Sequence, residues 1–467
     1  MALEGKGSIT NNSLFVYPRD ADLTKADLKS MLDYHSTELV AKYSKARKYY
    51  TGQHPILEEQ RTTNLDKPNN RLVVNYPRYI VDTFNGFFLG IEPKITLDDD
   101  SANEQLQQFN SADSVLDKLS EVSKQVSIYG RSYLFAYQNE ASETHLAVVS
   151  PESGFIIYDE SVAHDPLAFV RYEVDDDNEM TGTVYKNDGV FDLDLLPLTK
   201  KNADSGESVI VNPFKAVPAI EFFENNERQG TFENVETLID SVNKALSQKA
   251  NDVDYFADAY MKILGAKLDD DTLKNIKNNH IINFEGLNTD KIIVDFMEKP
   301  NADGEQENLI NRLNNLIFQI SMVANITDET FGNASSGVSL QYKLLAMRNL
   351  AAGKEHKFTQ SLRQLYKLIF GVNTILESVK GDEWQRLKFQ FTRNLPSNLA
   401  DEAATAKSLE GVVSRETQLK VLSVVDDPDA EIKRIDAESV KTMKQASRSA
   451  GEYDFQKKSG DDVNGKE

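Results

Sequence analysis

The chain has 467 residues, of which 40% are hydrophobic and 27% charged, as is typical of a soluble globular protein with about two to four domains. It contains no cysteine, which excludes disulfides, thiolate zinc sites and cysteine nucleophiles. The formal net charge of −22 argues against a conventional DNA-binding protein, because neutralising phosphates favours basic surfaces. An acidic chain is nevertheless compatible with DNA that slides past without sticking.

The N-terminal segment, residues 1–22, is expected to be irregular and flexible. It lacks the basic and apolar regions of a signal peptide, and the chain has no apolar run of the roughly 20 residues that span a membrane. We therefore expect synthesis and retention in the cytoplasm. Helical periodicity then predicts three helices, at Asp22–Tyr50 (closed by Gly52), Pro77–Phe88 and Glu104–Gln125, with a strand at Lys94–Leu97.

The pattern changes to a period of two after these helices, and predicts an antiparallel sheet over Ser127–Phe223. Its clearest hairpin signal is Lys186-Asn187-Asp188-Gly189. Seven runs read as strands: SYLFAYQ, THLAVVS, GFIIYDE, PLAFVRYEV, GTVYKN, GVFDLDLL and AVPAIEFF.

The C-terminal half contains long helical patterns. A helix over Gly230–Met261 and one from Asn308 to Ile326 flank a compact α/β insertion, and a longer helix over Val338–Val379 follows, with Gly353 and Gly371 as candidate kinks. Between residues 337 and 380 there are seven Lys or Arg against two acids, a local excess of five positive charges. Such a cationic helix suits either phosphate or an acidic neighbouring subunit.

The last part of the chain has weaker patterns. A strand is predicted around Lys388–Phe391, and two or three modest helices over Leu399–Ala450. From Gly451 onward the polar composition is typical of a disordered tail.

Three acidic triplets, at residues 98–100, 175–177 and 269–271, are the strongest candidates for a metal site. Each lies at an expected turn, so solvated carboxylates are the favoured interpretation. No Walker-type phosphate loop, nucleophile elbow or histidine pair at metal-ligand spacing is present. The sequence therefore offers no catalytic constellation, and we expect no enzyme activity, metal or cofactor.

Several stretches, taken in order, resemble the portal proteins of long-tailed (siphovirus-type) bacteriophages. The resemblance covers roughly residues 40–395. It is carried by YYTGQHPI, NNRLVVNYPRYIVDTFNGFFLGIEP, SIYGRSYLFAY, VVSPESGFIIYDE, FVRYEV, VYKNDGV and ITDETFGNASSGVSLQYKL.

This resemblance implies a helix-rich α+β portal-type fold: a wing of helices and antiparallel sheet, long stem helices, a small α/β clip and a helical crown. It also implies a ring, expected to be a homododecamer, at one capsid vertex, with a channel for double-stranded DNA. The implied ranges are wing 23–229, first stem helix 230–261, clip 262–303, second stem helix 304–327, tunnel loop 328–337, long wing helix and strand 338–396, crown 397–450 and disordered tail 451–467.

The resemblance also suggests functional residues. The loop facing DNA would consist of Asp328, Glu329, Thr330, Phe331, Gly332, Asn333, Ala334, Ser335, Ser336 and Gly337. Cations facing DNA or a neighbouring subunit would be Lys343, Arg348, Lys354 and Lys357. The clip would dock the motor or adaptor through Asp269, Asp270, Asp271, Lys274, Lys277, Asn288 and Asp290.

The implied partners are the chain itself, double-stranded DNA, the large terminase subunit, a head-completion adaptor, and capsid and scaffolding proteins, with no membrane. The implied location is the virion, after assembly in the host cytoplasm. Two alternatives remain at this point: a metal-dependent nuclease using the Asp clusters, and a helical scaffold protein that forms no ring.

Overall fold

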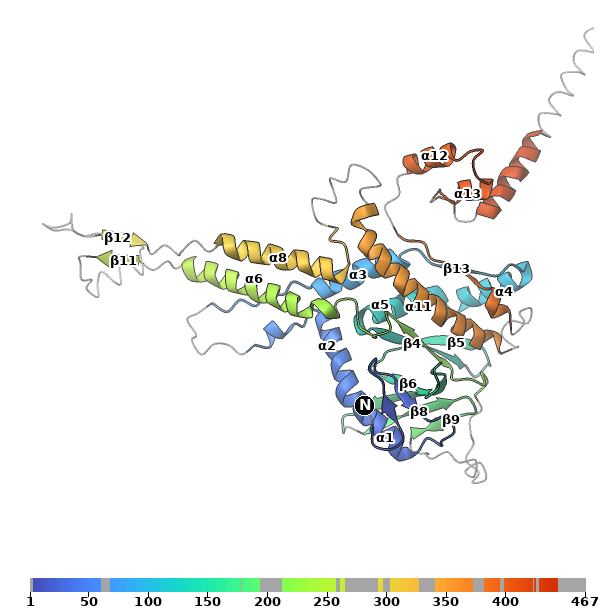
Figure 1. The fold of residues 1–467 in the computed structure, drawn as a ribbon, viewed down its shortest axis with the longest axis horizontal. Coiled ribbons are helices and arrows are strands. Elements are labelled where there is room, and N and C mark those ends of the chain that lie inside the picture. Colours follow the sequence, from blue (N-terminus) through green and yellow to red (C-terminus); the bar gives the residue numbers. More distant parts are fainter. Residues whose placement is uncertain are drawn as a thin grey trace, which may run out of the picture. The chain divides into compact units, whose positions relative to one another are not determined.

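The computed structural model describes residues 3–59, 68–177, 179–193, 212–257, 261–264, 293–296, 303–326, 341–372, 382–394, 399–422, 424–425 and 428–443. The chain divides into two compact units, Met1–Asn394 and Leu395–Glu467. Figure 1 labels many of the helices and strands of the two units. No helix among the described residues is long and apolar enough to cross a membrane.

A six-stranded sheet begins at the N-terminus, with strand order β1-β2-β6-β7-β8-β9. Its strands are β1 (Ser8–Ile9), β2 (Phe15–Tyr17), β6 (Gly154–Asp159), β7 (Pro166–Val174), β8 (Met180–Lys186) and β9 (Val190–Asp192). The expectation of a flexible segment at 1–22 is wrong, because β2 pairs in parallel with β6 and its three residues are buried. Parallel pairing with a strand about 140 residues away leaves no local sequence signal.

The predicted β8–β9 hairpin is confirmed, since the amide of Lys186 donates to the carbonyl of Gly189 over 2.9 Å. The remaining predicted strands form a second, three-stranded sheet rather than one continuous sheet. Its order is β10-β4-β5, built from β10 (Ala219–Phe223), β4 (Arg131–Gln138) and β5 (Thr144–Val149).

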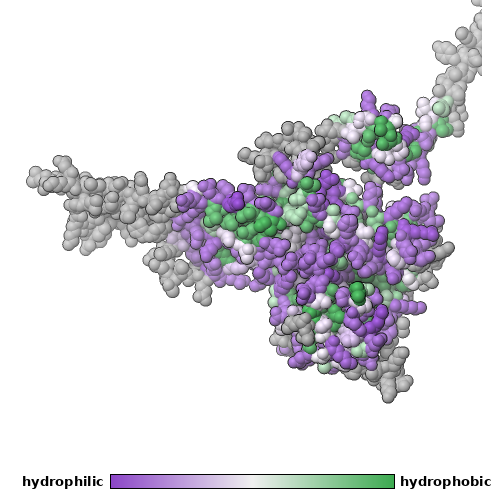
Figure 2. Space-filling model, viewed as in Figure 1, coloured by the Kyte–Doolittle hydropathy of each residue, from purple (hydrophilic) through white to green (hydrophobic). Residues whose placement is uncertain are grey.

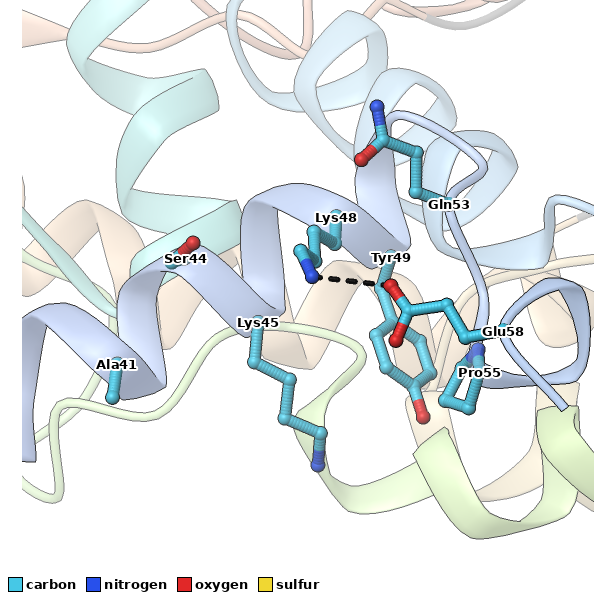
Figure 3. Close-up of a pocket in the computed structure, with 8 residues that line it drawn as sticks. All are labelled: Ala41, Ser44, Lys45, Lys48, Tyr49, Gln53, Pro55 and Glu58. Carbon is cyan, nitrogen blue, oxygen red and sulfur yellow. Dashed lines mark hydrogen bonds and ion pairs between the residues drawn. The ribbon is translucent and has the colours of Figure 1, made fainter. Parts of the chain in front are cut away.

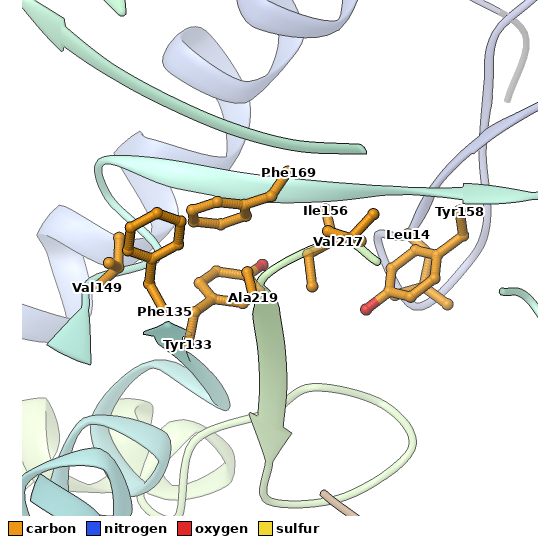
Figure 4. Packing of buried hydrophobic residues seen from close by; sticks show 9 residues of the cluster. All are labelled: Leu14, Tyr133, Phe135, Val149, Ile156, Tyr158, Phe169, Val217 and Ala219. Carbon is orange, nitrogen blue, oxygen red and sulfur yellow. The ribbon is translucent and has the colours of Figure 1, made fainter. Parts of the chain in front are cut away.

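The hydrophobic core of the region predicted as the wing lies between the two sheets. Tyr133 and Phe135 project from one face of β4, as the two-residue strand period requires. They meet side chains of β6 and β7, and the ring centroids of Phe135 and Phe169 lie 5.7 Å apart (Figure 4). The cluster consists of Leu14, Tyr133, Phe135, Val149, Ile156, Tyr158, Phe169, Val217 and Ala219.

The first predicted helix is confirmed with one irregularity. It comprises α1 (Lys25–Tyr34), a π-helical turn η1 (His35–Leu39) and α2 (Val40–Tyr50). The side chain of Thr24 caps α1 by accepting from the amide of Asp27. Gly52 follows α2 with a φ of +84°, the left-handed conformation that favours glycine.

The helix predicted at Glu104–Gln125 is in fact two helices, α4 (Asp100–Ala112) and α5 (Val115–Tyr129). Between them, Ser114 has a φ of +50°, and the carboxylate of Asp113 accepts from the amide of Leu146 on β5 over 2.8 Å. This tertiary bond fixes the break. The helix α3 (Tyr76–Leu89) agrees with its predicted range to within a residue at each end.

The long helices of the C-terminal half are α6 (Glu236–Ala257), preceded by the 3-10 turn η5 (Glu233–Val235), α8 (Asp303–Ser321) and α11 (Leu345–Phe370). Between α6 and α8 in the sequence, β11 (Met261–Leu264) pairs with β12 (Ile293–Phe296). The helix α11 continues through Gly353 and ends at Phe370, with Gly371 as its C-cap. Residues 338–340 and 373–379 of the predicted helix lie outside the described residues. The strand β13 (Lys388–Gln390) pairs with β3 (Lys94–Thr96), and the 3-10 turns η2 (Pro55–Leu57) and η7 (Glu383–Arg386) complete the unit.

The second unit is helical, as predicted. It contains α12 (Leu399–Ser408), α13 (Arg415–Leu419) and a helix over 428–443. Within its described residues, Ala406 is the one buried hydrophobic side chain, whereas Val412 and Met443 are more than 70% exposed.

Candidate subunit interface and channel-facing helices

The helices α6 and α8 lie side by side and form the pair predicted as the stem (Figure 1). Ile239 and Val242 on α6, and Ile310 and Ile317 on α8, are at most 5% exposed. At the other end of the pair, the ammonium of Lys249 contacts the carboxylate of Glu307. The hairpin of α6 and α8 therefore has its own apolar seam.

A second apolar stripe on α8 is only partly covered by the residues that the structure describes. Leu309 and Ile320 are 52% and 47% exposed, and Leu313 and Leu316 between them are half-buried. The spacings of four, three and four residues place all four side chains on one side of the helix. That side lies about 100° around the helix from the buried side chain of Ile310. Figure 2 shows hydrophobic surface over α8 in this region.

Apolar side chains grouped on one side of a helix and left about half exposed at both ends of the group are typical of an interaction surface. Spacing alone predicts a single stripe that contains Leu309, Leu313, Leu316 and Ile320 together with Ile317 and Val323. In the structure, Ile317 and Val323 are buried and the other four are not. The sequence therefore identified the apolar residues of α8 but not their division between two faces.

The four cations predicted to face DNA or a neighbouring subunit lie on or next to α11, but they differ in environment. Arg348 is exposed, Lys343 is half-buried, and Lys357 is half-buried with its ammonium 5.6 Å from the ring centroid of Phe223. Lys354 has a side chain that is 0% exposed. The prediction for Lys354 is therefore wrong, because its charge is buried within the chain and faces neither DNA nor another subunit.

Lys354 is instead the centre of a buried ion pair. Its Nζ lies 2.8 Å from Oε2 of Glu224, and it donates to Oγ of Ser127 over 2.7 Å and to the carbonyl of Ser123 over 3.1 Å. The rings of Phe84, Phe88 and Phe358 surround the ammonium at 5.1 to 5.4 Å. Burial lowers the pKa of Lys354, and the Glu224 carboxylate opposes that shift. These contacts tie α11 to α3, α5 and the end of β10.

A second buried charge cluster, which sequence reasoning missed, lies at Glu221 on β10. Its carboxylate lies 3.0 Å from Nη2 of Arg228 and 3.5 Å from Nε of Arg131, and it accepts from the hydroxyl of Tyr158 over 2.8 Å. Burial by itself would raise the pKa of Glu221, but the two guanidinium groups outweigh it and keep that pKa below its usual range. The strand alternation gave no signal that these charges would meet.

The triplet at residues 175–177 lies in a turn as predicted, whereas the one at residues 98–100 begins the helix α4. Asp99 caps α4 by accepting from the amide of Ala102, and Asp175 accepts from the amides of Asp177 and Glu179 in the β7–β8 turn. The third triplet lies outside the described residues. So do all ten tunnel-loop residues, 328–337, and the clip residues Lys274, Lys277, Asn288 and Asp290.

A shallow pocket of about 260 Å³ lies on α2 and η2 (Figure 3). The charged side chains that line it are paired: Lys48 with Glu58 over 3.2 Å, and Lys45 with Glu236 on α6 over 2.6 Å. The pocket thus borders the contact between α2 and α6.

Comparison with known proteins places the chain in a family. The family described as "Phage portal protein, SPP1 Gp6-like" matches residues 30–445. The portal protein of Bacillus phage SPP1 is 23% identical over 450 residues, covering 88% of this chain and 86% of that protein. The portal protein of Clostridium phage phiCD119 is 24% identical over 250 residues, covering 51% of this chain and 52% of that protein.

Solved structures give weaker matches. The neck of an empty GTA particle computed with C6 symmetry has a TM-score of 0.45 at 10% identity, covering 81% of this chain and 93% of that one. The neck of a native GTA particle computed with C12 symmetry has a TM-score of 0.43, also at 10% identity, with 82% and 93% coverage. The family match, which extends over most of the sequence, is decisive, and this chain belongs to the phage portal protein family, SPP1 Gp6-like.

Proposed function

We propose that this portal protein assembles into a ring, expected to contain twelve subunits, at one vertex of a phage capsid. Double-stranded DNA passes through the central channel during packaging and ejection. The ring also serves as a platform on which the large terminase subunit and later a head-completion adaptor dock. In this role the protein is a conduit and assembly platform, not an enzyme.

The uncovered apolar stripe of α8 is the observation that carries the proposal. A closed ring needs two different faces on each subunit, one to meet the next subunit and one to meet the previous one. Leu309 and Ile320, with the half-buried Leu313 and Leu316 between them, supply one such face on the stem, because much of their apolar area stays uncovered by the described residues.

The charge of the chain supports the same function. Every residue that lines the channel of a ring recurs once in each subunit, so a weak attraction to phosphate is multiplied. The net charge of −22 keeps the genome from adhering. The loop at 328–337 has no Lys or Arg, so we propose that it touches DNA through bulk and mobility rather than by gripping phosphate. Of the four predicted cations, Lys343, Arg348 and Lys357 remain in the proposal.

The mass and shape of the purified protein test the ring. Twelve chains of 52.5 kDa make an assembly of about 630 kDa, and negative-stain electron microscopy should show rings with a central hole. Replacing Leu309 and Ile320 together by Asp places charges on the apolar stripe, and light scattering should then detect smaller species. Val162→Asp is the matched control, because that side chain is fully exposed on the β6–β7 turn.

Two outcomes would contradict these proposals. Rings that form equally well in the Leu309 and Ile320 double variant would remove the stripe from the interface. For the loop, Phe331→Ala and deletion of 333–336 should impair genome packaging or retention. Normal packaging and retention in both variants would show that the tunnel-loop assignment is wrong.

A further inference from the structure

Polar side chains form a continuous row along the stem helix α6 and the turn that precedes it. Seven residues share one side of the helix, because their spacings are three or four residues throughout. Each contacts a group outside the stem. The row consists of Glu233, Glu236, Asp240, Asn243, Ser247, Asn251 and Asp254.

The first half of the row contacts α2. The Nζ of Lys42 lies 2.9 Å from Oε1 of Glu233, and the Nζ of Lys45 lies 2.6 Å from Oε2 of Glu236. One turn further along, the hydroxyl of Tyr49 donates to Asp240 over 2.7 Å. Figure 3 shows Lys45 and Tyr49 extending from α2 on this side. Tyr49 is 2% exposed, so this half is fixed by packing as well as by polar contacts.

The second half of the row holds an extended segment, Asn70–Val74, which we call the strap. The amides of Val74 and Leu72 donate to Oδ1 of Asn243 and to Oγ of Ser247, each over 2.8 Å. The amide of Asn70 donates to Oδ1 of Asn251 over 2.5 Å. The helix thus binds every second amide of the strap.

Geometry explains this pairing. Two residues of extended chain advance about 6.6 to 6.8 Å, and four residues of helix advance about 6.0 Å. The two repeats therefore remain in step over three contacts and drift apart beyond them. This mode of binding therefore limits the strap to a short segment.

The strap has little apolar anchorage of its own. Leu72 is 44% exposed, whereas the side chains beneath the strap, Asn243 and Ser247, are 0% and 4% exposed. At its C-terminal end Asn75 is firmly held, since its Nδ2 donates to the carbonyl of Tyr50 over 3.0 Å and its Oδ1 caps α3. Release of the strap would therefore begin at Asn70 and end at Asn75.

We propose that Asn70–Val74 is a releasable strap that detaches from α6 while the wing remains folded. In the closed state it joins the stem helix to the start of α3. In the open state α6 is held to the wing by α2, and Asn243, Ser247 and Asn251 become accessible. Local opening of this kind is expected where a segment has many polar contacts and few buried apolar ones. This proposal does not depend on the ring.

A single cysteine tests the strap, because the chain has no natural cysteine. Ser247→Cys places a thiol beneath Leu72. Ser361→Cys is the matched control, since Ser361 is 1% exposed and donates to the carbonyl of Glu221 inside the wing. In the folded protein a soluble thiol reagent should modify Cys at 247 at least about tenfold faster than Cys at 361.

A second substitution addresses the mechanism. Asn251→Ala removes the contact to the amide of Asn70 and should accelerate modification at 247 about five- to tenfold, the effect of one hydrogen bond. Lys244→Ala, at an exposed position of α6, should leave that rate unchanged.

Hydrogen exchange measures the opening of the strap in the unsubstituted protein, without any variant. The amides of Asn70, Leu72 and Val74 should exchange faster than those of the strand pair β6–β7. The proposal is overturned if the thiols at 247 and 361 react equally slowly and the strap amides exchange at the rate of global unfolding.

Discussion

Lys354 illustrates how the position of a residue on a helix can outweigh its charge. It lies in a cationic stretch, and that composition suggested a surface residue. Its spacing from Met347, Ala351 and Phe358, however, places it on the stripe that α11 buries. The wing accommodates the ammonium with Glu224 and three aromatic rings. The sequence contained the signal for burial, but not the identity of the partner.

We expect Lys354→Met to destabilise the protein by about 3 to 5 kcal/mol, because the substitution leaves the carboxylate of Glu224 buried without its counter-charge. Urea unfolding measures the change. Lys357→Met on the same helix is the control and should cost less than about 1 kcal/mol. Adding Glu224→Gln to Lys354→Met should restore part of the loss. Equal stability of Lys354→Met and the parent would contradict this account of the ion pair.

His35 should make stability depend on pH. Burial, together with the charge of Arg131, lowers the pKa of His35 to about 3, and its Nδ1 lies 2.7 Å from the hydroxyl of Tyr172. The pKa of His35 in the folded protein lies below its value in the unfolded chain. The contribution of His35 to the free energy of unfolding is therefore fully present above about pH 6.5 and is lost as the pH falls. Between pH 7 and 5 this residue should account for a loss of about 2 kcal/mol.

The pH test compares the parent with His35→Phe, which keeps a ring among Phe15, Phe155 and Tyr43 but cannot be protonated. Urea midpoints measured from pH 7 to 5 should fall more steeply in the parent. Parallel curves would mean that His35 is protonated in the folded state at the same pH as in the unfolded state.

At the scale of elements, the sequence located most helices and strands but not the breaks that tertiary contacts impose. The boundary between α4 and α5 is such a case. Asp113 leaves the helix to bind His145 and the amide of Leu146 on β5, at 3.1 and 2.8 Å. Ser114 consequently adopts a positive φ, which costs energy for any residue with a Cβ atom. Neither residue breaks helical periodicity by itself.

Because of this break, glycine should change the stability of the protein in opposite directions at two nearby serines. Ser114→Gly should stabilise the protein by roughly 0.5 to 1 kcal/mol, since glycine adopts positive φ without strain. Ser111→Gly, at an exposed position within α4, should instead destabilise it by a similar amount. Thermal unfolding of both variants measures these changes. Destabilisation by Ser114→Gly would show that the left-handed conformation carries no strain.

At the scale of the molecule, the two units differ in how much core they contain. The unit Met1–Asn394 buries nearly all of the described hydrophobic core, whereas the described residues of Leu395–Glu467 bury one hydrophobic side chain. Val412, Val424 and Met443 remain at least 65% exposed. The second unit therefore contributes little hydrophobic stabilisation by itself.

Truncation after Asn394 tests this division. The remaining chain should keep its main thermal transition within about 2 °C of the parent, because about 1 kcal/mol produces a shift of that size. Circular dichroism and calorimetry measure the transition. A much lower midpoint would show that the first unit depends on the C-terminal residues for its stability.

The sequence by itself determined most of the helices and strands after residue 22, the α+β class, the resemblance to phage portals and the turn role of the acidic residues at 175–177. Local periodicity and turn chemistry encode all of these. Only the tertiary structure decided that β2 joins β6, that Lys354 is buried, and which stripe of α8 stays uncovered. Each of these features depends on contacts between residues far apart in the chain. A periodic pattern shows whether one face of a helix or strand is apolar or polar, but it does not show which other element packs against that face.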